Sequence, residues 1–310
     1  MTNFNQLIVM KKKFLDMSIF QFQKRFPNDK ACYAYLAKCK WPHGFKCERC
    51  SHTKCCQGKG PQYFQCTKCR YQASPTSGTM FHKTKLPLLK AFYIIYYTVT
   101  SKHGIASTEL SRKLGLRQKT CWAFQQKIAR AIAGGTLPQL YGKVEVDESV
   151  VGAREQGVKG RKNIKKRLIV VGLELKGKGV ARMYSQVIKN ASSSELRRFF
   201  SKYISPSARI RTDEWRGYCP LRSSYSELQQ EKSGRNGSNF PLMHRVIMMI
   251  KSYIRGTHHS VKRLQSYLDQ YAYRFNNRIL KGQIFDDLIE KMIHCQPITH
   301  KELYNYYLNV

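Results

Sequence analysis

The sequence predicts a multidomain α/β protein, in which a small cysteine-rich module and a helical region precede a domain built on a mixed sheet. Three observations predict this organisation. Four cysteines form two CxxC pairs in the N-terminal part, and the next sixty or so residues have apolar side chains at helical spacing. From Lys143 onward, short apolar runs typical of strands alternate with amphipathic helical patterns. The expected segments are residues 1–40, 41–73, 74–136, 143–280 and 281–310.

The charge of the chain predicts a polyanionic partner. The 310 residues include 55 Lys+Arg and 19 Asp+Glu, a formal net charge of +36. This is more than solubility requires, and nucleic acid is the first choice of partner, with a membrane surface as the alternative.

Two features argue against the membrane. The sequence contains no run of about 18 apolar residues, and its N-terminus lacks the pattern of a signal peptide. We therefore expect no membrane partner and a cytoplasmic, nucleoid-associated protein. In a reducing compartment the eleven cysteines are expected to be metal ligands or buried thiols rather than disulfides.

Residues 1–40 are expected to form short helices that pack in a core. Asn28 and Asp29 are typical of a helix start, and the segment ACYAYLAKCK that follows has helical character.

Residues 41–73 predict a zinc ribbon. Two CxxC pairs are separated by fifteen residues, and four thiolates at that spacing can surround one tetrahedral Zn²⁺, with each pair on a tight turn. The zinc is expected to be structural, because the protein fills all four positions. Cys55 and Cys56 lie between the pairs and are alternative ligands. The expected ligands are Cys47, Cys50, Cys66 and Cys69.

Residues 74–136 are expected to be helical and to end in a helix-turn-helix. Lys85–Thr100 is mostly apolar, which predicts a buried helix. Ser107 or Thr108 can cap a first short helix, and Gly115 permits the tight turn before a second.

The second of these helices is the candidate for reading DNA in the major groove, with a purely structural hairpin as the alternative. Its side chains Cys121, Phe124 and Ile128 are expected to face inward. The side chains expected to face outward and contact DNA are Arg117, Gln118, Lys119, Gln125 and Lys127.

The stretch Lys143–Gly152, KVEVDESVVG, contains the first candidate catalytic residue. Its alternating valines predict a strand, and Asp147 interrupts the strand at its middle. A carboxylate in a strand is costly unless it is paired, hydrogen-bonded or bound to a cation. The hypothesis is that Asp147 binds a divalent metal in a nuclease-like site. The alternative is an exposed strand whose acids, Glu145 and Glu148 included, pair with lysines and arginines.

The elements after this strand follow the order of a ribonuclease-H-like fold: a meander of three strands, a helix, then a parallel strand. In that fold the middle of the first strand lies beside the end of the fourth, which here is Asp213. Asp147 and Asp213 are therefore expected to be neighbours. The elements are expected at Leu168–Leu175, Val180–Ile188, Ser192–Ile204, Ala208–Trp215, Pro241–Tyr253 and Val261–Arg278.

Two close carboxylates repel unless a cation lies between them. Mg²⁺ takes such ligands together with waters and phosphates, and two such ions suit phosphoryl displacement. A third ligand is expected from the helix Pro241–Tyr253, which has no acid. His244 is the candidate, and an imidazole suits Mn²⁺ better than Mg²⁺. Lys251, on the same face, is a candidate for holding a phosphate, with a solvated lysine as the alternative.

A basic loop, Gly157–Arg167, follows the first strand. It is expected either to contact DNA phosphates or to be only a solvated turn. The candidate side chains are Lys159, Arg161, Lys162, Lys165 and Lys166.

Taken together, these pieces resemble the insertion-sequence transposases that have an N-terminal zinc ribbon and a DDE-type, ribonuclease-H-like core. The resemblance covers roughly residues 20–278, in the same order as in that family. Its motifs are WPHGFKCERC, FQCTKCRYQ, SGTMFHKTKL, VEVDESVVG, RTDEWRGY, HRVIMMIKSYIRGTHH and LQSYLDQYAYRFNNR.

The resemblance implies metal-dependent cutting of double-stranded DNA at terminal inverted repeats, followed by attack of the freed 3′-hydroxyl on target DNA, by a homo-oligomer. Asp147 and Asp213 match the first two acids of the family. His244 falls where most members have glutamate, and Lys251 matches a trailing basic residue. A DNA-binding protein with an inactive core and a stand-alone endonuclease are the alternatives.

Overall fold

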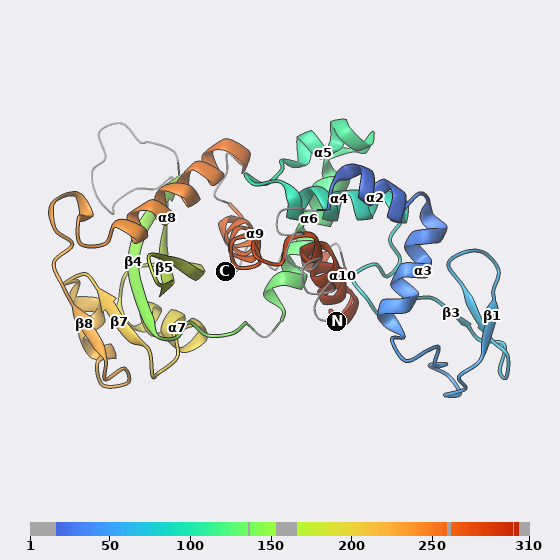
Figure 1. The fold of residues 1–310 in the computed structure, drawn as a ribbon, viewed down its shortest axis with the longest axis horizontal. Helices are drawn as coiled ribbons and strands as arrows, with labels where there is room; N and C mark the ends of the chain where they lie inside the picture. Colours follow the sequence, from blue (N-terminus) through green and yellow to red (C-terminus); the bar gives the residue numbers. More distant parts are fainter. Residues whose placement is uncertain (1–16, 136, 153–165, 259–261, 300, 304–310) are drawn as a thin grey trace, which may run out of the picture. The chain divides into compact units, whose positions relative to one another are not determined.

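The computed structural model of the chain describes residues 17–135, 137–152, 166–258, 262–299 and 301–303 (Figure 1). The chain divides into two compact units. The first comprises Met1–Gly134 and Asn277–His300, and the second Gly135–Asn276 and Lys301–Val310. No helix within the described ranges is long and apolar enough to cross a membrane.

The first unit combines a small antiparallel sheet with a set of helices. The sheet has the order β1-β2-β3, with strands Cys55–Gln57, Phe64–Cys66 and Gln72–Ala73. Asn28 caps α3 by accepting a hydrogen bond from the Ala31 N–H, as the start signal predicts. The helices are α2 (Ile19–Arg25), α3 (Asp29–Lys40), α4 (Leu88–Thr100), α5 (Ser107–Leu114), α6 (Gln118–Ala133) and α10 (Ile284–His294), the last preceded by η4 (Lys281–Gln283).

Helix α10 completes the core of this unit from the far end of the chain, a segment for which the sequence pattern predicts no particular role. The ring of Phe285 is 1% exposed. Its centroid lies 5.7 Å from that of Phe22, 5.5 Å from that of Phe26 and 5.7 Å from that of Phe92. Beside it, Asp286 accepts hydrogen bonds from Arg25 and from the Tyr35 hydroxyl. The C-terminal helix is therefore part of the first unit's hydrophobic core.

We expect Phe285→Ala to lower the free energy of unfolding of the first unit by about 3–5 kcal/mol, because it removes a buried ring and leaves a cavity. Denaturant unfolding followed by circular dichroism measures the change. Phe20→Ala is the matched control, since the Phe20 side chain on α2 is 78% exposed, and it should change stability by no more than about 0.5 kcal/mol. Equal effects of the two substitutions would contradict the role given to α10.

Helices α5 and α6 form the predicted pair of helices joined by a short turn. Gly115 ends α5 with a φ of +59°, a left-handed conformation that glycine adopts without strain. Cys121, Phe124 and Ile128 are buried, as predicted. The predicted serine or threonine cap is wrong: Ala106 is the N-cap, without a side-chain hydrogen bond, and Ser107 instead accepts one from Gln118.

The prediction that Gln125 and Lys127 face outward is also wrong. Gln125 is 4% exposed and donates to the Ile105 carbonyl at 2.9 Å. Lys127 is half-buried, donates to the Met80 carbonyl at 3.2 Å, and has its pKa lowered by burial. The helical repeat explains the error, because position 125 follows Cys121 by four residues and lies on the same face.

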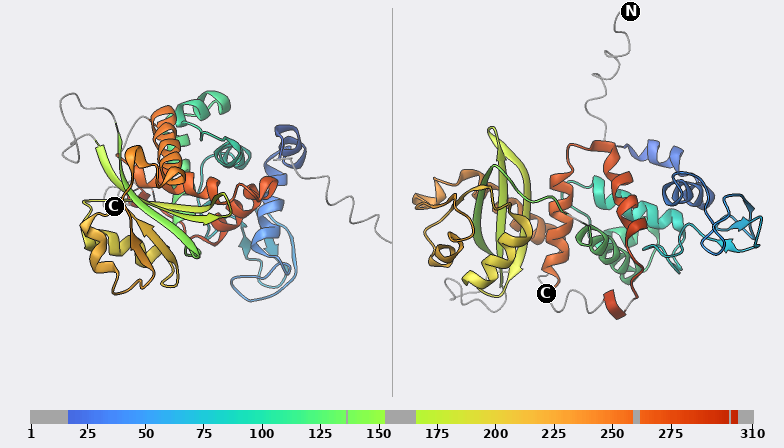
Figure 2. Two further views of the ribbon diagram at one scale, coloured as in Figure 1. Left: turned by 60° about the vertical axis from the view of Figure 1, so that its left-hand side comes forward. Right: turned by 90° about the horizontal axis from the view of Figure 1, so that it is seen from below.

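The second unit is built on a five-stranded mixed sheet of order β6-β5-β4-β7-β8 (Figures 1 and 2). Strands β4, β5 and β6 are antiparallel neighbours, whereas β7 runs parallel to both β4 and β8. The short strand β8 was not expected from the sequence. The strands are β4 (Lys143–Gly152), β5 (Lys166–Lys176), β6 (Gly179–Ile188), β7 (Arg209–Thr212) and β8 (Leu228–Gln230).

Helices cover both faces of this sheet. On one face, Val144 and Val146 of β4 belong to an apolar cluster with Phe199 of α7. On the other face, Val151 belongs to a cluster with residues of α8 and α9, such as Val246. Because β4 side chains alternate between the two faces of the sheet, this strand contributes to two separate hydrophobic cores. The helices are α7 (Ser193–Tyr203), α8 (Pro241–Tyr253) and α9 (Leu264–Asn276), with the short segments η1 (Arg216–Leu221), η2 (Arg235–Gly237) and η3 (Ile254–His258).

Amide side chains of α9 cover the free edge of β6. Asn276 accepts a hydrogen bond from the Met183 N–H and donates one to the Met183 carbonyl, at 2.8 and 2.9 Å. Gln265 accepts from the Val187 N–H and donates to the Ser185 carbonyl. These bonds satisfy edge groups that would otherwise be open to pairing with another strand.

Candidate metal centres

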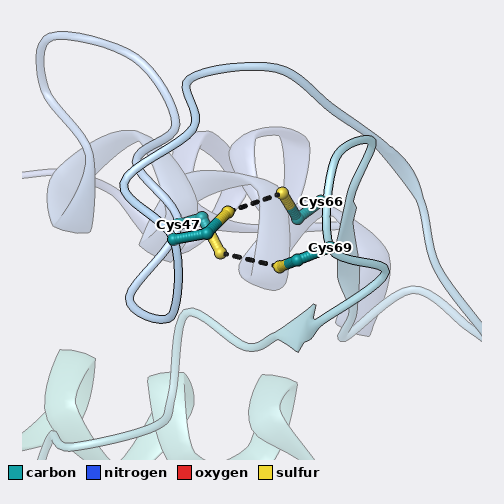
Figure 3. Close-up of side chains that lie close together, drawn as sticks. Cys47, Cys66 and Cys69 are labelled. Carbon is teal, nitrogen blue, oxygen red and sulfur yellow. Dashed lines mark hydrogen bonds between the residues drawn. The ribbon is translucent and has the colours of Figure 1, made fainter.

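The four predicted cysteine ligands of the ribbon lie together. One sulfur from each falls within 4.8 Å of the other three, and the sulfurs of Cys47 and Cys69, and of Cys50 and Cys66, are 3.6 Å apart (Figure 3). A tetrahedron with Zn–S bonds of about 2.3 Å has edges of about 3.8 Å, so the donor set fits Zn²⁺. Cys55 lies on β1 and is not part of this cluster.

The two CxxC turns have the same backbone geometry. In the first, the Ser51 N–H donates to the Cys47 carbonyl and Ser51 has a φ of +57°. In the second, the Arg70 N–H donates to the Cys66 carbonyl and Arg70 has a φ of +61°. Each pair of thiols is therefore held by its own tight turn, as expected of a zinc ribbon.

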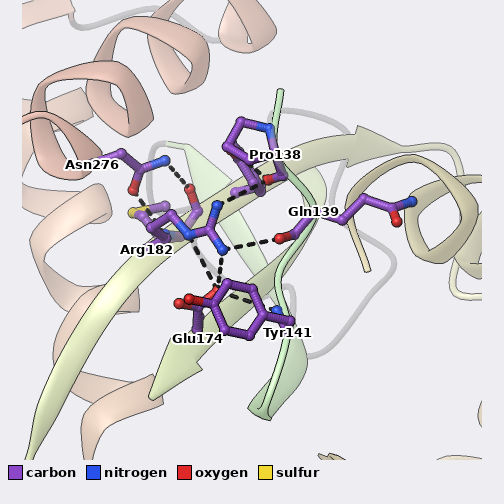
Figure 4. A network of polar contacts seen from close by, with 8 residues as sticks. Pro138, Gln139, Tyr141, Glu174, Arg182 and Asn276 are labelled. Atoms are coloured by element: carbon purple, nitrogen blue, oxygen red, sulfur yellow. Dashed lines mark hydrogen bonds and ion pairs between the residues drawn. The ribbon is translucent and has the colours of Figure 1, made fainter. Parts of the chain in front are cut away.

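In the second unit, the approach to β4 is anchored by an ion pair (Figure 4). Arg182 on β6 contacts Glu174 on β5, with an Nη2–Oε2 distance of 2.6 Å, and also donates to the Pro138 and Gln139 carbonyls. The same carboxylate accepts the Tyr141 N–H at 3.1 Å. These contacts fix the chain just before the strand that carries Asp147.

The structure brings Asp147 and Asp213 together. In the parallel pairing of β4 with β7, the last pair is Val146 with Thr212. The residues that follow this pair in the sequence are Asp147 and Asp213. Their carboxylates and that of Glu148 each offer an oxygen within 4.8 Å of the other two. Three hard oxygen donors at this spacing suit Mg²⁺ or Mn²⁺.

Glu148 is the member of this group that the sequence pattern does not single out. Neighbouring side chains of a strand point to opposite faces, which argues against Asp147 and Glu148 sharing one site. Because β7 ends at Thr212, β4 has no paired neighbour on that side at Asp147, and side chains from both faces can meet Asp213. The sequence feature that could have identified Glu148 is its position next to Asp147 in a chain with few acidic residues.

Local hydrogen bonds orient the two aspartates. One oxygen of Asp147 accepts the Glu148 N–H at 2.7 Å, and one of Asp213 accepts the Trp215 N–H at 3.1 Å. Gln230 on β8 donates to the carbonyls of Asp213 and Trp215. The loop after β7 is thus held at both of its ends.

The electrostatics of the group favour a cation. Burial, followed by repulsion from Asp213, raises the pKa of Asp147 to about 6, although the Glu148 N–H and the charges of His244 and Lys251 oppose this. The pKa of the buried Tyr218 hydroxyl also rises well above its usual value, because of burial and then the charge of Glu148. Glu145 is also buried, and burial raises its pKa, although the charge of Arg211 opposes this.

Arg211 is the partner of Glu145 and links β4 to the start of α8. Its guanidinium lies 3.3 Å from Glu145 and 2.8 Å from Glu231 on the segment after β8. It also donates to the Asn239 carbonyl and lies over the Phe240 ring, 4.9 Å from its centroid. Arg211 thereby ties the beginning of α8 to the strand that carries Asp147.

His244 on α8 lies outside the group of three carboxylates, among the residues that the structure describes. Its ring packs against Gly237, where an added Cβ would come within 1.8 Å of the His244 Nε2 atom. Gly237 also has a φ of +75°. Both the contact with His244 and this left-handed backbone conformation therefore favour glycine at this position. The imidazole is nevertheless close enough for its charge to lower the pKa of Asp147.

Basic side chains gather around Asp147. Burial and the charges of Arg255 and Lys166 lower the pKa of Lys251, while the charge of Asp147 opposes them. These three cations come from α8, η3 and the start of β5. Their charges act on one another and on Asp147, so positive charge lies close to this carboxylate.

Of the candidate DNA contacts, Arg117, Gln118 and Lys119 are exposed at the start of α6. Lys166 is described at the start of β5. The other loop candidates, Lys159, Arg161, Lys162 and Lys165, lie outside the described residues.

Two family models match the chain. An ISXO2-like transposase domain matches residues 139–276, and a transposase zinc-ribbon domain matches residues 27–72. Both models describe domains of IS1595 transposases, and together they span more than half of the chain. A search of curated proteins finds no significant match.

Among solved structures, the pre-cleavage Mos1 transpososome matches with 11% identity and a TM-score of 0.29, covering 64% of this chain and 75% of that chain. The Mos1 strand transfer complex matches with 10% identity and the same TM-score, covering 67% and 79%. The family assignment rests on the two family models and on the ribbon and sheet described above. The chain belongs to the IS1595-type insertion-sequence transposases, which join a zinc ribbon to a DDE-type, ribonuclease-H-like core.

Proposed function

We propose that this transposase binds double-stranded DNA at the terminal inverted repeats of its element, cuts it, and transfers the freed 3′-hydroxyl to target DNA. The observation that carries this proposal is the group formed by Asp147, Glu148 and Asp213. Three acids lie together in a chain with a net charge of +36, and the pKa of Asp147 is raised to about 6 by burial and by Asp213. Such a group is unfavourable by itself and favourable around divalent cations.

In this proposal the three carboxylates, with His244 as a further ligand, would hold Mg²⁺ or Mn²⁺, and the ion would stabilise charge on the attacking and leaving oxygens. The chain's own residues bind and orient the DNA strand. Lys251, Arg255 and Lys166 contact phosphate oxygens next to the carboxylates. Backbone N–H groups of Glu148 and Trp215 keep the aspartates in one orientation, so that little reorganisation accompanies the reaction.

For DNA recognition, we assign base contacts to Arg117, Gln118 and Lys119. These exposed side chains lie at the start of the second helix of the helix-turn-helix, the end that meets base edges in the major groove. The Zn²⁺ of the ribbon has a structural role. Joining two element ends requires two cutting sites in one complex, so we expect a homo-oligomer on DNA, at the nucleoid.

The test uses oligonucleotides that carry the inverted repeats flanking the gene, incubated with zinc-loaded protein and either Mg²⁺ or Mn²⁺. Metal-dependent strand cleavage with joined products is the expected result. Binding without products in either metal would contradict the proposal and favour a DNA-binding protein with an inactive core. Cleavage without joining would favour a stand-alone endonuclease.

The histidine in the third position leads to a prediction about metal preference. We expect the wild-type protein to cut faster with Mn²⁺ than with Mg²⁺, because an imidazole suits Mn²⁺ better. In His244→Glu the difference between the cleavage rates with Mn²⁺ and with Mg²⁺ should become smaller, since glutamate supplies a hard oxygen ligand. Cleavage rates measured for both proteins in both metals check this, and an unchanged ratio would exclude His244 as a ligand.

A further inference from the structure

A cavity of about 540 Å³ lies beside the carboxylates, on the face of the sheet that α7 covers. Its floor includes Val150 of β4 and Leu168 of β5, which are cross-strand partners. Val150 follows Glu148 by two residues, so the two side chains point to the same face. The volume falls within the range of about 300–1,000 Å³ that is typical of sites for small organic groups. Of the side chains that line it, only Lys166 has been given a role above.

One wall of the cavity is the indole of Trp215, which is 37% exposed. The ring is held in place: its Nε1–H donates to the Ala191 carbonyl at 2.7 Å. It also packs on Gly217, where an added Cβ would lie 2.6 Å from the Trp215 Nε1 atom. A fixed aromatic ring facing a cavity is a platform on which another flat ring can stack at little entropic cost.

The same residue connects the cavity to the carboxylates. The Trp215 N–H donates to a carboxylate oxygen of Asp213, and Gln230 binds the carbonyls of both residues. A phosphate held at the carboxylates therefore lies only a short stretch of backbone away from the indole.

The other walls are suited to an anion. Lys166, Arg167 and Lys189 line the cavity together with Ser192. Ser192 is the N-cap residue of α7 but makes no side-chain capping bond. Ser192, at the start of this eleven-residue helix, therefore lies beside three cations, while Glu195 of the first turn accepts the Lys189 N–H. A helix N-terminus next to cations favours phosphate.

We propose that this cavity binds an unpaired DNA nucleotide next to the phosphate that is cut, with its base stacked on Trp215 and its own phosphate beside Lys189 and the start of α7. The inference rests on the proposed function and adds to it a base-binding site. A stacking platform accepts every base, so the site would recognise a nucleotide that has left the duplex rather than a particular sequence.

The test is a binding measurement that does not depend on cleavage. Fluorescence anisotropy at fixed salt compares a short single-stranded DNA oligonucleotide with the same strand made abasic. Wild-type protein is expected to bind the base-containing strand more tightly by on the order of tenfold. Trp215→Ala should lose most of this preference, and Trp215→Phe, which keeps a ring, should retain most of it.

Two further variants keep the result interpretable if Trp215→Ala folds poorly. Val150→Trp fills the cavity while leaving Trp215 itself unchanged and should also remove the preference. Tyr141→Ala removes another aromatic ring of the same unit, one that is 61% exposed, and should leave the preference unchanged. If Val150→Trp and a folded Trp215→Ala both keep the wild-type preference, the cavity is not a base site. Because no step requires cutting, failure of the proposed function would show separately, as a wild-type protein that cuts no DNA.

Discussion

Replacing Asp147 by asparagine is expected to lower the rate of DNA cleavage by about 10³-fold or more, with DNA affinity unchanged. Cations at such a site supply several kcal/mol of charge stabilisation, and each 1.36 kcal/mol corresponds to about a tenfold change in rate. Asp213→Asn should have the same effect. Single-turnover cleavage of end-bearing DNA, together with anisotropy for binding, measures both quantities. Glu227→Gln, which changes an exposed acid of the same unit, is the control and should cut normally.

The same substitution should stabilise the protein when divalent ions are absent. The pKa of Asp147 is raised to about 6, above its usual 3.8, by burial and by Asp213. A raised pKa means that folding favours the protonated form, so the contribution of Asp147 to stability is most favourable below about pH 4 and is lost as the pH rises through 6. At pH 7 this cost is on the order of 3 kcal/mol, and Asp147→Asn avoids it.

Thermal unfolding of zinc-loaded protein, desalted into buffer without added Mg²⁺ or Mn²⁺ and without a chelator, reveals this effect. Between pH 4 and pH 7 the wild-type protein should lose more stability than Asp147→Asn does. Addition of Mn²⁺ at pH 7 should stabilise the wild-type protein and have less effect on the variant. A variant that is less stable than wild type at pH 7 would contradict the repulsion between Asp147 and Asp213.

Replacing Cys66 by serine is expected to abolish stoichiometric zinc binding and to unfold the ribbon. Structural zinc contributes about 10–16 kcal/mol of binding free energy in small zinc modules at neutral pH, far more than three short strands can supply alone. Metal analysis should find about one zinc per wild-type chain and much less in the variant.

Cys56→Ser is the matched control for the zinc prediction. Cys56 is an exposed residue of β1, ten positions before Cys66 and outside the sulfur cluster. Its replacement should leave the zinc content at the wild-type level. A full complement of zinc in Cys66→Ser, or its loss in Cys56→Ser, would mean that the metal is held by other cysteines.

Much of the second unit could be predicted from local sequence. Strand β4 spans Lys143–Gly152 and helix α8 spans Pro241–Tyr253, with the predicted bounds. The two-residue alternation of valines predicts the strand, and the proline at the first helical position predicts the start of the helix. Tertiary contacts in the folded unit agree with both local signals. The meeting of Asp147 with Asp213 was also predictable, because the order of elements determines which strands are neighbours.

The features that were missed depend on tertiary structure or on the end of a strand. Glu148 joins the two aspartates only because β7 ends before it, and a strand end is poorly defined by sequence. Phe285 and its helix α10 were missed because an amphipathic pattern does not say which distant residues it will cover. Gln125 was misplaced because its polarity was given more weight than its four-residue spacing from Cys121, although a buried amide needs only one nearby carbonyl.

The central claim is that Asp147 and Asp213 together hold the catalytic cation, and anomalous diffraction from crystals of a DNA-end complex grown with Mn²⁺ tests it most directly. We predict a manganese peak bonded to carboxylate oxygens of both residues, and no such peak in Asp147→Asn crystals. A DNA complex in which manganese is bound elsewhere, with both carboxylates free of metal, would contradict the account.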